Sequence, residues 1–221
     1  MPRRSHIAVK LARNASPKDL AVKLAASYDV PVAKIAAVEV PFHDATTRLE
    51  LYNLKSLPVE IREWIWDLFE RNMRSSYEAS DDGWKPQEKR KELFHAESRF
   101  IVLQSGDQEE DGIRRSKGLG YALFRFDTEE TAGDEDADVL YCYELQIDSE
   151  SHRLGAGKLL MQALNRIGLQ MKMDKTILTV FKANTSAIAF YEKIGFSTDE
   201  IDPSNYGEQV DYLILSNSYS E

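Results

Sequence analysis

The segment Glu144–Leu160, ELQIDSESHRLGAGKLL, decides the fold of this chain. It begins at the end of Val139–Ile147, whose length and apolar, aromatic composition predict a β-strand. After it, the apolar residues of Lys158–Met173 recur with a helical period. They are Leu160, Ala163, Leu164, Ile167 and Met171. A strand, a glycine loop and a helix in this order predict a protein of the mixed α/β class.

Two segments of the chain carry a Gly-x-Gly pattern, and their positions distinguish them. A phosphate-binding loop works when its backbone N–H groups open a helix, whose dipole adds partial positive charge. Lys117–Gly120 leads into the predicted strand Tyr121–Phe126, whereas Leu154–Gly157 leads into the helix from Lys158. The second segment is therefore the candidate anion-binding loop, and a plain strand–helix turn is the alternative.

This loop is neither of the common nucleotide-binding loops. In a P-loop, His152 would have to be glycine and Leu159 would have to be Ser or Thr. A dinucleotide fingerprint would need glycine in place of Leu160. Any ligand bound here is held by a different arrangement.

The rest of the chain completes one domain. Further strands are predicted, and Arg99–Gln104 and Tyr121–Phe126 are expected to pair as a hairpin across a polar connection at 105–119. Helices are predicted at 17–30, after Pro58 and at Ser186–Lys193, whereas 80–90 is predicted to be a loop. The remaining predicted strands are Thr46–Tyr52, Thr176–Phe181 and Asp211–Leu215, and Ile35–Val40 could be a short helix or a strand. We expect a mostly antiparallel, twisted sheet flanked by helices in residues 46–221, with a basic, partly helical extension in 1–45 that wraps the core.

Composition excludes several classes of protein. The mean hydropathy is −0.45 and no stretch approaches the roughly 18 apolar residues of a membrane span, which excludes an integral membrane protein. The single cysteine, Cys142, excludes an internal disulfide and a Cys-rich zinc site, and we expect no metal.

Charge is unevenly distributed along the chain. Residues 1–23 carry six basic side chains and one acid, so of the formal net charge of −9 the remainder carries −14. Such a body repels nucleic acid and attracts basic partners. The basic start can be interpreted as a transit peptide or, with better support, as a basic tail or nuclear-entry patch.

The segments after the glycine loop point to a known family. The order of strand, glycine loop, helix and strand, followed by ANTSAIAFYEKIGF at 183–196, resembles the GNAT acetyltransferases over about residues 98–215. One difference is His152, which stands where the family usually has Arg or Gln, with Arg153 beside it.

Shorter runs are similar to a narrower family, the N-terminal acetyltransferases of type D. These runs are NMRSSYE (72–78), FRFD (124–127), VLYCYE (139–144) and LTVFKAN (178–184). That family acetylates the α-amine of the N-terminal serine of histone 4 and histone 2A. A second difference is Asp82, which stands where the family pattern has tryptophan.

The resemblance implies acetyl-coenzyme A as cosubstrate and a set of residues that bind it. They are Leu145, Gln146 and Ile147 for the pantetheine arm, Arg153, Leu154, Gly155, Ala156, Gly157 and Lys158 for the pyrophosphate, and Thr179 and Asn184 on the far side. Glycines that allow close backbone approach, next to a cationic side chain, suit such a ligand.

The resemblance also implies catalytic and substrate-binding residues. Glu144 is the first candidate for general base, with Tyr143 in the catalytic set and Asp127 as the second acid, or as a holder of a substrate cation. The expected peptide pocket consists of Tyr77, Asp127, Tyr141, Tyr143, Glu144 and Tyr212. Strict alternation puts Cys142 and Glu144 on one face of their strand, unless a bulge intervenes. Tyr191 stands where many relatives have a general acid.

The implied enzyme is a monomer that acts on histone tails in the cytoplasm and nucleus, on the ribosome or on free histones. Two alternatives stay open. The chain could acetylate a lysine side chain or a polyamine, or it could be a catalytically silent protein that binds coenzyme A and histones.

Overall fold

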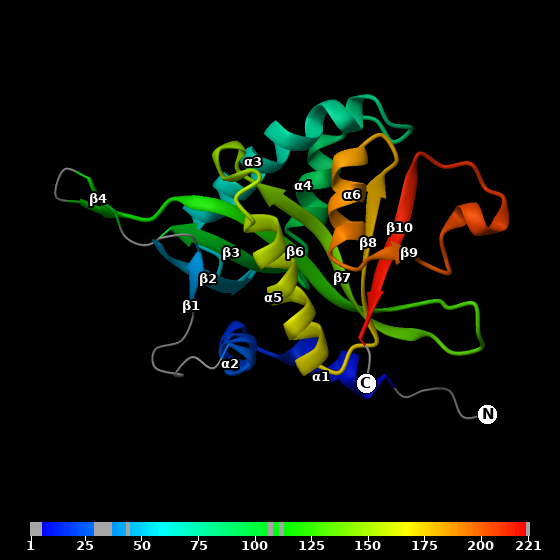
Figure 1. Ribbon diagram of the computed structural model, residues 1–221, viewed down its shortest axis with the longest axis horizontal. Coiled ribbons are helices and arrows are strands. Elements are labelled where there is room, and N and C mark those ends of the chain that lie inside the picture. Colours follow the sequence, from blue (N-terminus) through cyan, green and yellow to red (C-terminus); the bar gives the residue numbers. More distant parts are fainter. Residues whose placement is uncertain (1–5, 29–36, 43–44, 106–107, 111–112, 220–221) are drawn as a thin grey trace.

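The computed structural model describes residues 6–28, 37–42, 45–105, 108–110 and 113–219 as one open sheet between two layers of helices (Figure 1). The eight-stranded sheet has the order β1-β2-β3-β6-β7-β8-β10-β9. Its strands are β1 (Ala37–Phe42), β2 (Ala45–Asn53), β3 (Arg99–Ser105), β6 (Gly118–Glu129), β7 (Ala137–Ile147), β8 (Lys175–Phe181), β9 (Ser197–Thr198) and β10 (Tyr212–Ser218). Among the described strands only β7 and β8 pair in parallel, so the mixed, mostly antiparallel class is confirmed.

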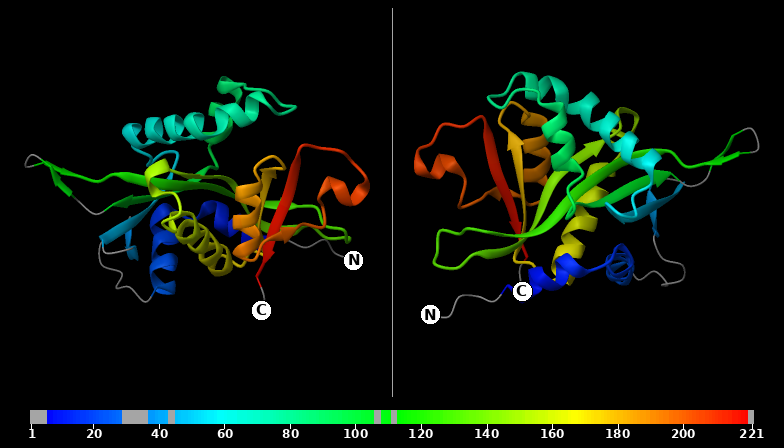
Figure 2. Two further views of the ribbon diagram at one scale, coloured as in Figure 1. Left: turned by 45° about the horizontal axis from the view of Figure 1, so that its top comes forward. Right: turned by 180° about the vertical axis from the view of Figure 1, so that it is seen from behind.

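The α-helices cover the two faces of the sheet (Figure 2). They are α1 (Ile7–Asn14), α2 (Pro17–Ser27), α3 (Val59–Glu78), α4 (Pro86–Leu93), α5 (Ala156–Gln170) and α6 (Thr185–Lys193). Helices α3 and α4 lie on one face, whereas α1, α2, α5 and α6 lie on the other. No described helix is long and apolar enough to cross a bilayer.

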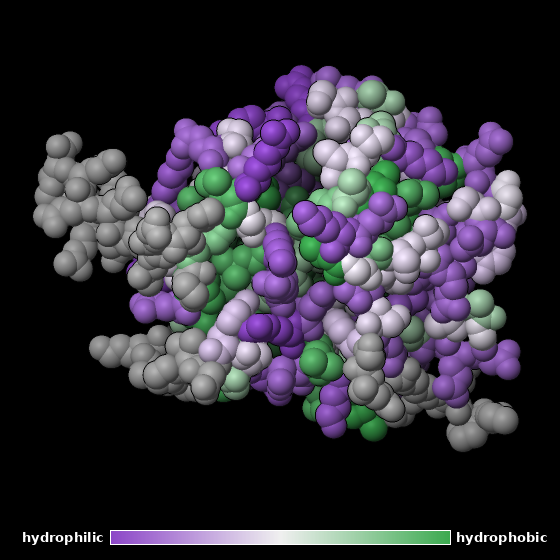
Figure 3. Space-filling model, in the orientation of Figure 1, coloured by the Kyte–Doolittle hydropathy of each residue, from purple (hydrophilic) through white to green (hydrophobic). Residues whose placement is uncertain are grey.

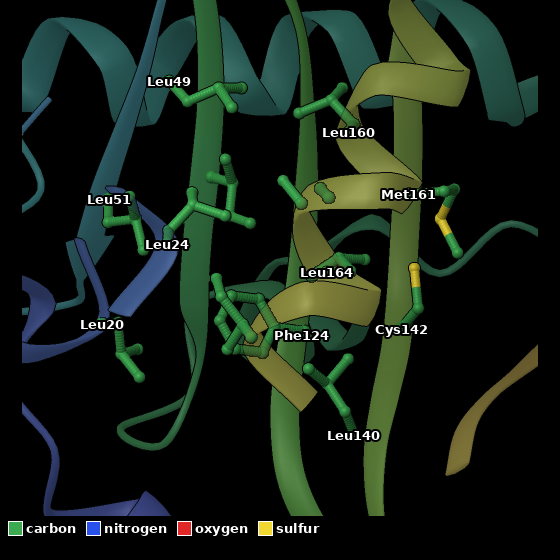
Figure 4. Packing of buried hydrophobic residues seen from close by; sticks show 14 of the residues in the cluster. Leu20, Leu24, Leu49, Leu51, Phe124, Leu140, Cys142, Leu160, Met161 and Leu164 are labelled. Carbon is green, nitrogen blue, oxygen red and sulfur yellow. The ribbon is translucent and has the colours of Figure 1, made fainter. Parts of the chain in front are cut away.

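Each face of the sheet has its own hydrophobic core. Leu160, Leu164 and Ile167 form the buried stripe of α5 and pack on the strands below it, as Figure 4 shows for the two leucines. On the opposite face, Ile65 and Phe69 of α3 are fully buried against β3 and β6. In each core, one helix (α5 or α3) contributes a stripe of apolar residues that recur with the helical period.

The N-terminal helices belong to the larger core. A capping box between Ser16 and Asp19 starts α2, and Leu20 and Leu24 are buried against the sheet and α5. The guanidinium of Arg99 donates to the carbonyl oxygens at the end of α1. Residues 37–42, in the segment expected to be an extension, form the edge strand β1. Residues 1–5, with part of the basic tail, lie outside the described residues.

Strand β7 holds the most informative irregularity of the sheet. Leu123 of β6 pairs with Glu144, but the next residue, Phe124, pairs with Cys142. Tyr143 is therefore the extra residue of a β-bulge. The bulge that was left open as the alternative to strict alternation is therefore present, and Cys142 and Glu144 do not share a face, because the bulge turns Glu144 to the face of α3 and α4.

One expectation is wrong. The segment 80–90 is not all loop, because α4 begins at Pro86, where proline is compatible with the first turn of a helix. The expected hairpin of β3 and β6 is confirmed, and its connection contains the short strands β4 (Gln108–Glu110) and β5 (Ile113–Arg115). The predicted strands around the glycine loop and the helix after it are confirmed, with boundaries shifted by a few residues.

The first glycine motif lies inside β6 and has a packing role. A Cβ atom on Gly118 would lie 2.5 Å from the ring of Trp64, and one on Gly120 would lie 2.8 Å from the carbonyl oxygen of Gln146. The glycines thus let α3 and β7 approach β6 closely. Gly118 is therefore not a neutral position for substitution.

We predict that Gly118→Ala lowers the free energy of unfolding by about 1–3 kcal/mol, the usual cost of overpacking. Trp64 cannot move away easily, because its ring packs against Tyr121 in the core beneath α3. Urea denaturation followed by tryptophan fluorescence measures the change. Gly133→Ala, in a more open turn, is the control and should change stability little. Equal stability of both variants would refute the packing role of Gly118.

Candidate active site

A cavity of about 1160 Å³ opens between β7, β8, α3 and the start of α5. In Figure 3, apolar residues lie recessed among hydrophilic ones on the face that carries α5 and α6. Most of the predicted site residues line this cavity. They are Tyr77, Tyr141, Tyr143, Glu144, Leu145, Gln146, Ile147, Arg153, Gly155, Ala156, Gly157, Lys158, Thr179, Asn184 and Tyr212.

The glycine loop forms one end of the cavity. Gly155 is the N-cap of α5 with φ of 92°, a left-handed conformation that favours glycine. The first N–H groups of α5 follow directly, so the positive end of the helix dipole faces this end of the cavity. Arg153 and Lys158 are exposed and add two cationic side chains. This end is built for an anion.

The middle of the cavity lies where β7 and β8 separate. The two strands pair from Val139 and Lys175 up to Cys142 and Leu178, and β7 continues beyond this point to Ile147. The backbone of Leu145–Ile147 therefore borders the cavity instead of a neighbouring strand on that side. Asn184 caps α6 on the opposite wall, where its side chain accepts a hydrogen bond from the N–H of Ala187.

Glu144 is buried at the other end of the cavity. Its side chain is only 6% exposed, and Oε2 accepts a hydrogen bond of 2.9 Å from Nε2 of Gln146. The amide of Asn72 on α3 donates in turn to Oε1 of Gln146 at 3.0 Å. This chain of donors fixes the orientation of the carboxylate.

Burial raises the pKa of Glu144 to about 7, while the charge of Lys89 and the hydrogen bond from Gln146 oppose the rise. A carboxylate that titrates near neutral pH can both take and release a proton there. Such a shifted acid in a cavity is typical of an active site.

Aromatic side chains surround the carboxylate. The hydroxyl groups of Tyr141 and Thr179 lie 2.7 Å apart, and the rings of Tyr141 and Tyr143 lie 4.6 Å apart. Tyr77 packs edge-on against Phe181, whose strand partner is Tyr212. Burial raises the pKa of Tyr77 and of Tyr141 to about 12, so both hydroxyls stay protonated at neutral pH.

Charge is segregated along the cavity. Its acids, Asp82, Glu92 and Glu144, come from the loop before α4, from α4 itself and from β7. Its cationic side chains Arg153, Lys158 and Lys193 come from the glycine loop and from helices α5 and α6. The cavity can therefore accept an anion at one end and a cation at the other.

Two predicted site residues do not line the cavity. Asp127 accepts a hydrogen bond of 2.6 Å from Arg13 and so ties α1 to the end of β6. Leu154 is exposed on the glycine loop. Two other acids, Asp199 and Asp202, also lie outside this cavity. Asp199 is buried against Lys175 at 2.6 Å, and Asp202 is buried as the cap of a short helical turn.

Sequence reasoning missed Asn72, Lys89 and Glu92 as part of this site. Lys89 was missed because it lies in the segment 80–90 that was predicted to be a loop, and Glu92 was missed because no element was predicted for the residues directly after that segment. The available signal was Pro86 at the start of a segment otherwise rich in helix-forming residues. Asn72 precedes Tyr77 in the quoted run 72–78, but nothing in the run marks it as a partner of Gln146.

Two other buried groups interact electrostatically with the carboxylate. Burial raises the pKa of Cys142, so its thiolate, the form required of a nucleophile, is rare at neutral pH. Burial also raises the pKa of Tyr191 far above its usual range, which leaves a protonated hydroxyl beside the cavity. Among the described residues, no cluster of His, Cys, Asp and Glu is arranged to hold a metal ion.

Comparison with known proteins identifies the family. Residues 59–196 match the model of the acetyltransferase (GNAT) family, so the chain belongs to that family. The chain is thus an acyltransferase whose cosubstrate is acetyl-coenzyme A.

Solved structures share the fold. One is described as the NatC complex bound to Gag peptide and CoA, with 15% identity over 78% of this chain and 99% of that chain and a TM-score of 0.52. Another is Ard1 from Thermoplasma volcanium, with 16% identity over 79% and 99% of the chains and a TM-score of 0.50. A third is a GNAT acetyltransferase from Listeria monocytogenes, with 12% identity over 82% and 100% of the chains and a TM-score of 0.51.

The residues present fit the cosubstrate. A Cβ atom on Gly157 would lie 3.3 Å from the ring of Phe190 and 3.8 Å from the side chain of Ile147, so a side chain at this point of the loop would crowd Phe190. Arg153, Lys158 and the first N–H groups of α5 are donors for the pyrophosphate of coenzyme A. The separated edge of β7 supplies backbone groups for its pantetheine amides.

We predict that Gly157→Glu abolishes binding of coenzyme A, because the new side chain fills the loop and its charge repels the pyrophosphate. Isothermal titration calorimetry with coenzyme A measures this loss. Gly133→Glu adds the same charge in a distant turn and should bind as the unmodified protein does. Binding by the Gly157 variant with unchanged affinity would show that the ligand does not use this loop.

Proposed function

We propose that this protein transfers the acetyl group of acetyl-coenzyme A to the N-terminal α-amine of histone 4 and histone 2A, with Glu144 as general base. The observation that carries the proposal is a buried carboxylate, Glu144, that titrates near neutral pH in the same cavity as the anion-binding glycine loop. The site residues quoted for the resemblance to N-terminal acetyltransferases of type D support it. The substrates imply work in the cytoplasm and nucleus.

The chemistry requires little from the base. In the reaction the amine nitrogen forms a bond to the acetyl carbon, the carbon–sulfur bond breaks, and the amine loses a proton. An α-amine has a reference pKa of about 8, below the value of about 10.4 for lysine, so a base near pH 7 suffices. Glu144 takes this proton, directly or through water, and the hydroxyl of Tyr191 is available to protonate the leaving thiolate.

The acidic end of the cavity supports a cationic substrate. Asp82 lines the cavity from the loop before α4 and is exposed, so it attracts the basic residues that follow the terminal serine of these histones. Tyr77, Tyr141, Tyr143 and Tyr212 narrow the space around the carboxylate. A small first residue suits such a pocket, because bulkier ones would clash with the rings.

We predict that Glu144→Gln lowers the turnover number by about 100-fold or more, the usual scale for loss of a general base. Binding of acetyl-coenzyme A should change little, because the phosphate-binding groups lie at the other end of the cavity. A single-turnover assay together with calorimetry separates the two effects.

Asp127→Asn is the matched control, because Asp127 pairs with Arg13 outside the cavity. It should reduce turnover far less than the change at Glu144. If Asp127→Asn abolished turnover and Glu144→Gln did not, the base would be Asp127 and the role given to Glu144 would be wrong.

We also predict selectivity for peptides that begin Ser-Gly-Arg-Gly with a free amine. Replacement of the third residue by alanine should raise KM more than it lowers kcat, and added salt should have the same effect, because exposed acids act on association. A peptide that begins Met-Leu should react slowest. Mass spectrometry of each product locates the acetyl group.

The other functions predict other products. Acetyl on an internal lysine or on a polyamine, with the terminal amine unmodified, would favour the lysine or polyamine acetyltransferase. Tight binding of coenzyme A and histone peptides without any product would favour the silent binding protein. Equal rates on all three peptides would contradict histone selectivity.

A further inference from the structure

A buried lysine packs against two residues that line the cavity together with the proposed base, and it has no assigned role. The side chain of Lys89 on α4 is only 14% exposed. Its Nζ lies 3.0 Å from both carboxylate oxygens of Glu92, one turn further along the helix. The same ammonium lies 4.7 Å from the centre of the Tyr77 ring. Glu92, Tyr77 and Glu144 line one end of the cavity, so this cation is held at the catalytic end.

The position of Lys89 differs from that of its neighbours on α4. Lys91 is exposed, and Arg90 leaves the site to pair with Glu63 on α3 at 2.5 Å. A lysine is seldom this buried unless paired, because loss of hydration disfavours the ammonium. Here the negative groups around it outweigh that cost, so the pKa of Lys89 is raised and not lowered. The side chain is a permanent positive charge at neutral pH.

We propose that Lys89 is a positioning residue whose ammonium keeps Glu144 in its ionised form and neutralises Glu92, so that the cavity presents one active carboxylate. This inference rests on the proposed role of Glu144 as base. It differs from a purely structural role, in which Lys89 would only attach α4 to α3.

The titratable groups that interact electrostatically with Glu144 explain why one cation matters. They come from five elements: Tyr77 on α3, Lys89 and Glu92 on α4, Tyr121 on β6, Cys142 on β7 and Tyr191 on α6. The Tyr and Cys members stay neutral at pH 7 because burial raises their pKa. Within this set of groups, Lys89 is therefore the one cation, and Glu92 is the one anion besides Glu144.

The consequence of removing Lys89 has a definite sign. The pKa of Glu144 is raised by burial, lowered by Lys89 and raised by Glu92. In Lys89→Met the lowering influence is lost and Glu92 is no longer neutralised, so both changes favour protonated Glu144. A nearby opposite charge usually shifts a carboxyl pKa by about 1–3 units. The base would then be protonated over most of the neutral range.

The experiment compares Lys89→Met, Lys89→Arg and the control Lys91→Met. A carbon-13 NMR titration of glutamate carboxyls, with the Glu144 signal assigned from its absence in Glu144→Gln, measures the pKa directly. We expect an upward shift of about 1 unit or more in Lys89→Met, a smaller shift in Lys89→Arg and none in Lys91→Met. With the histone peptide, a one-unit shift lowers kcat/KM at pH 7 about five-fold and has little effect near pH 9.5.

A double variant separates charge from structure. Lys89→Met with Glu92→Gln removes both the cation and its anion, so the pKa of Glu144 should return part of the way to its original value. An unchanged Glu144 titration in Lys89→Met, or a loss of kcat/KM that is equal at every pH, would overturn the inference. If the NMR shift occurs but no histone peptide is acetylated, Lys89 has the inferred effect and the proposed function is wrong.

Discussion

One extra residue in β7 determines which side of the sheet receives the catalytic carboxylate. Without the bulge at Tyr143, strict alternation would direct Glu144 toward α5, into the same core as Cys142. With it, Glu144 meets the polar groups of α3 and α4, including Asn72 through Gln146. The face of β7 toward α5 therefore packs in the hydrophobic core, and the face toward α3 and α4 carries the catalytic carboxylate. The position of Glu144 relative to Tyr141 and Tyr143 depends on the same bulge.

Burial of that carboxylate has a cost for the fold. An unfolded glutamate titrates near 4.3, whereas Glu144 titrates near 7 in the folded protein. The folded state therefore binds the proton more tightly, and stability falls as the pH rises between these two values, by roughly 3–4 kcal/mol at most. Lys89 and Gln146 offset part of this cost. Their side chains lower the free-energy cost of burying the charged carboxylate, but Glu144 still titrates near neutral pH.

The fold could be predicted from the sequence in those segments where the periodic apolar residues are also the residues buried in the core. Helix α5 was predictable because its apolar residues follow a single face, and the glycine loop was predictable because Gly155 precedes that face. Helix α4 was not, since its eight residues carry five charges and its side chains serve the cavity instead of a continuous core. The bulge at Tyr143 was weighed as possible, but its register is set by β6, and Asp127 was misplaced because its partner Arg13 is far away in the sequence.

The separation of β7 from β8 makes this fold sensitive to its ligand. Beyond Cys142 and Leu178 the two strands no longer share hydrogen bonds, so the sheet is held together there by β6, β10 and the helices. A molecule bound in the gap joins the two halves and stabilises the folded state by mass action, by about 2.7 kcal/mol when its concentration is 100 times Kd. The melting temperature of the protein should therefore rise with the concentration of acetyl-coenzyme A, because the unfolded chain has no site that binds it.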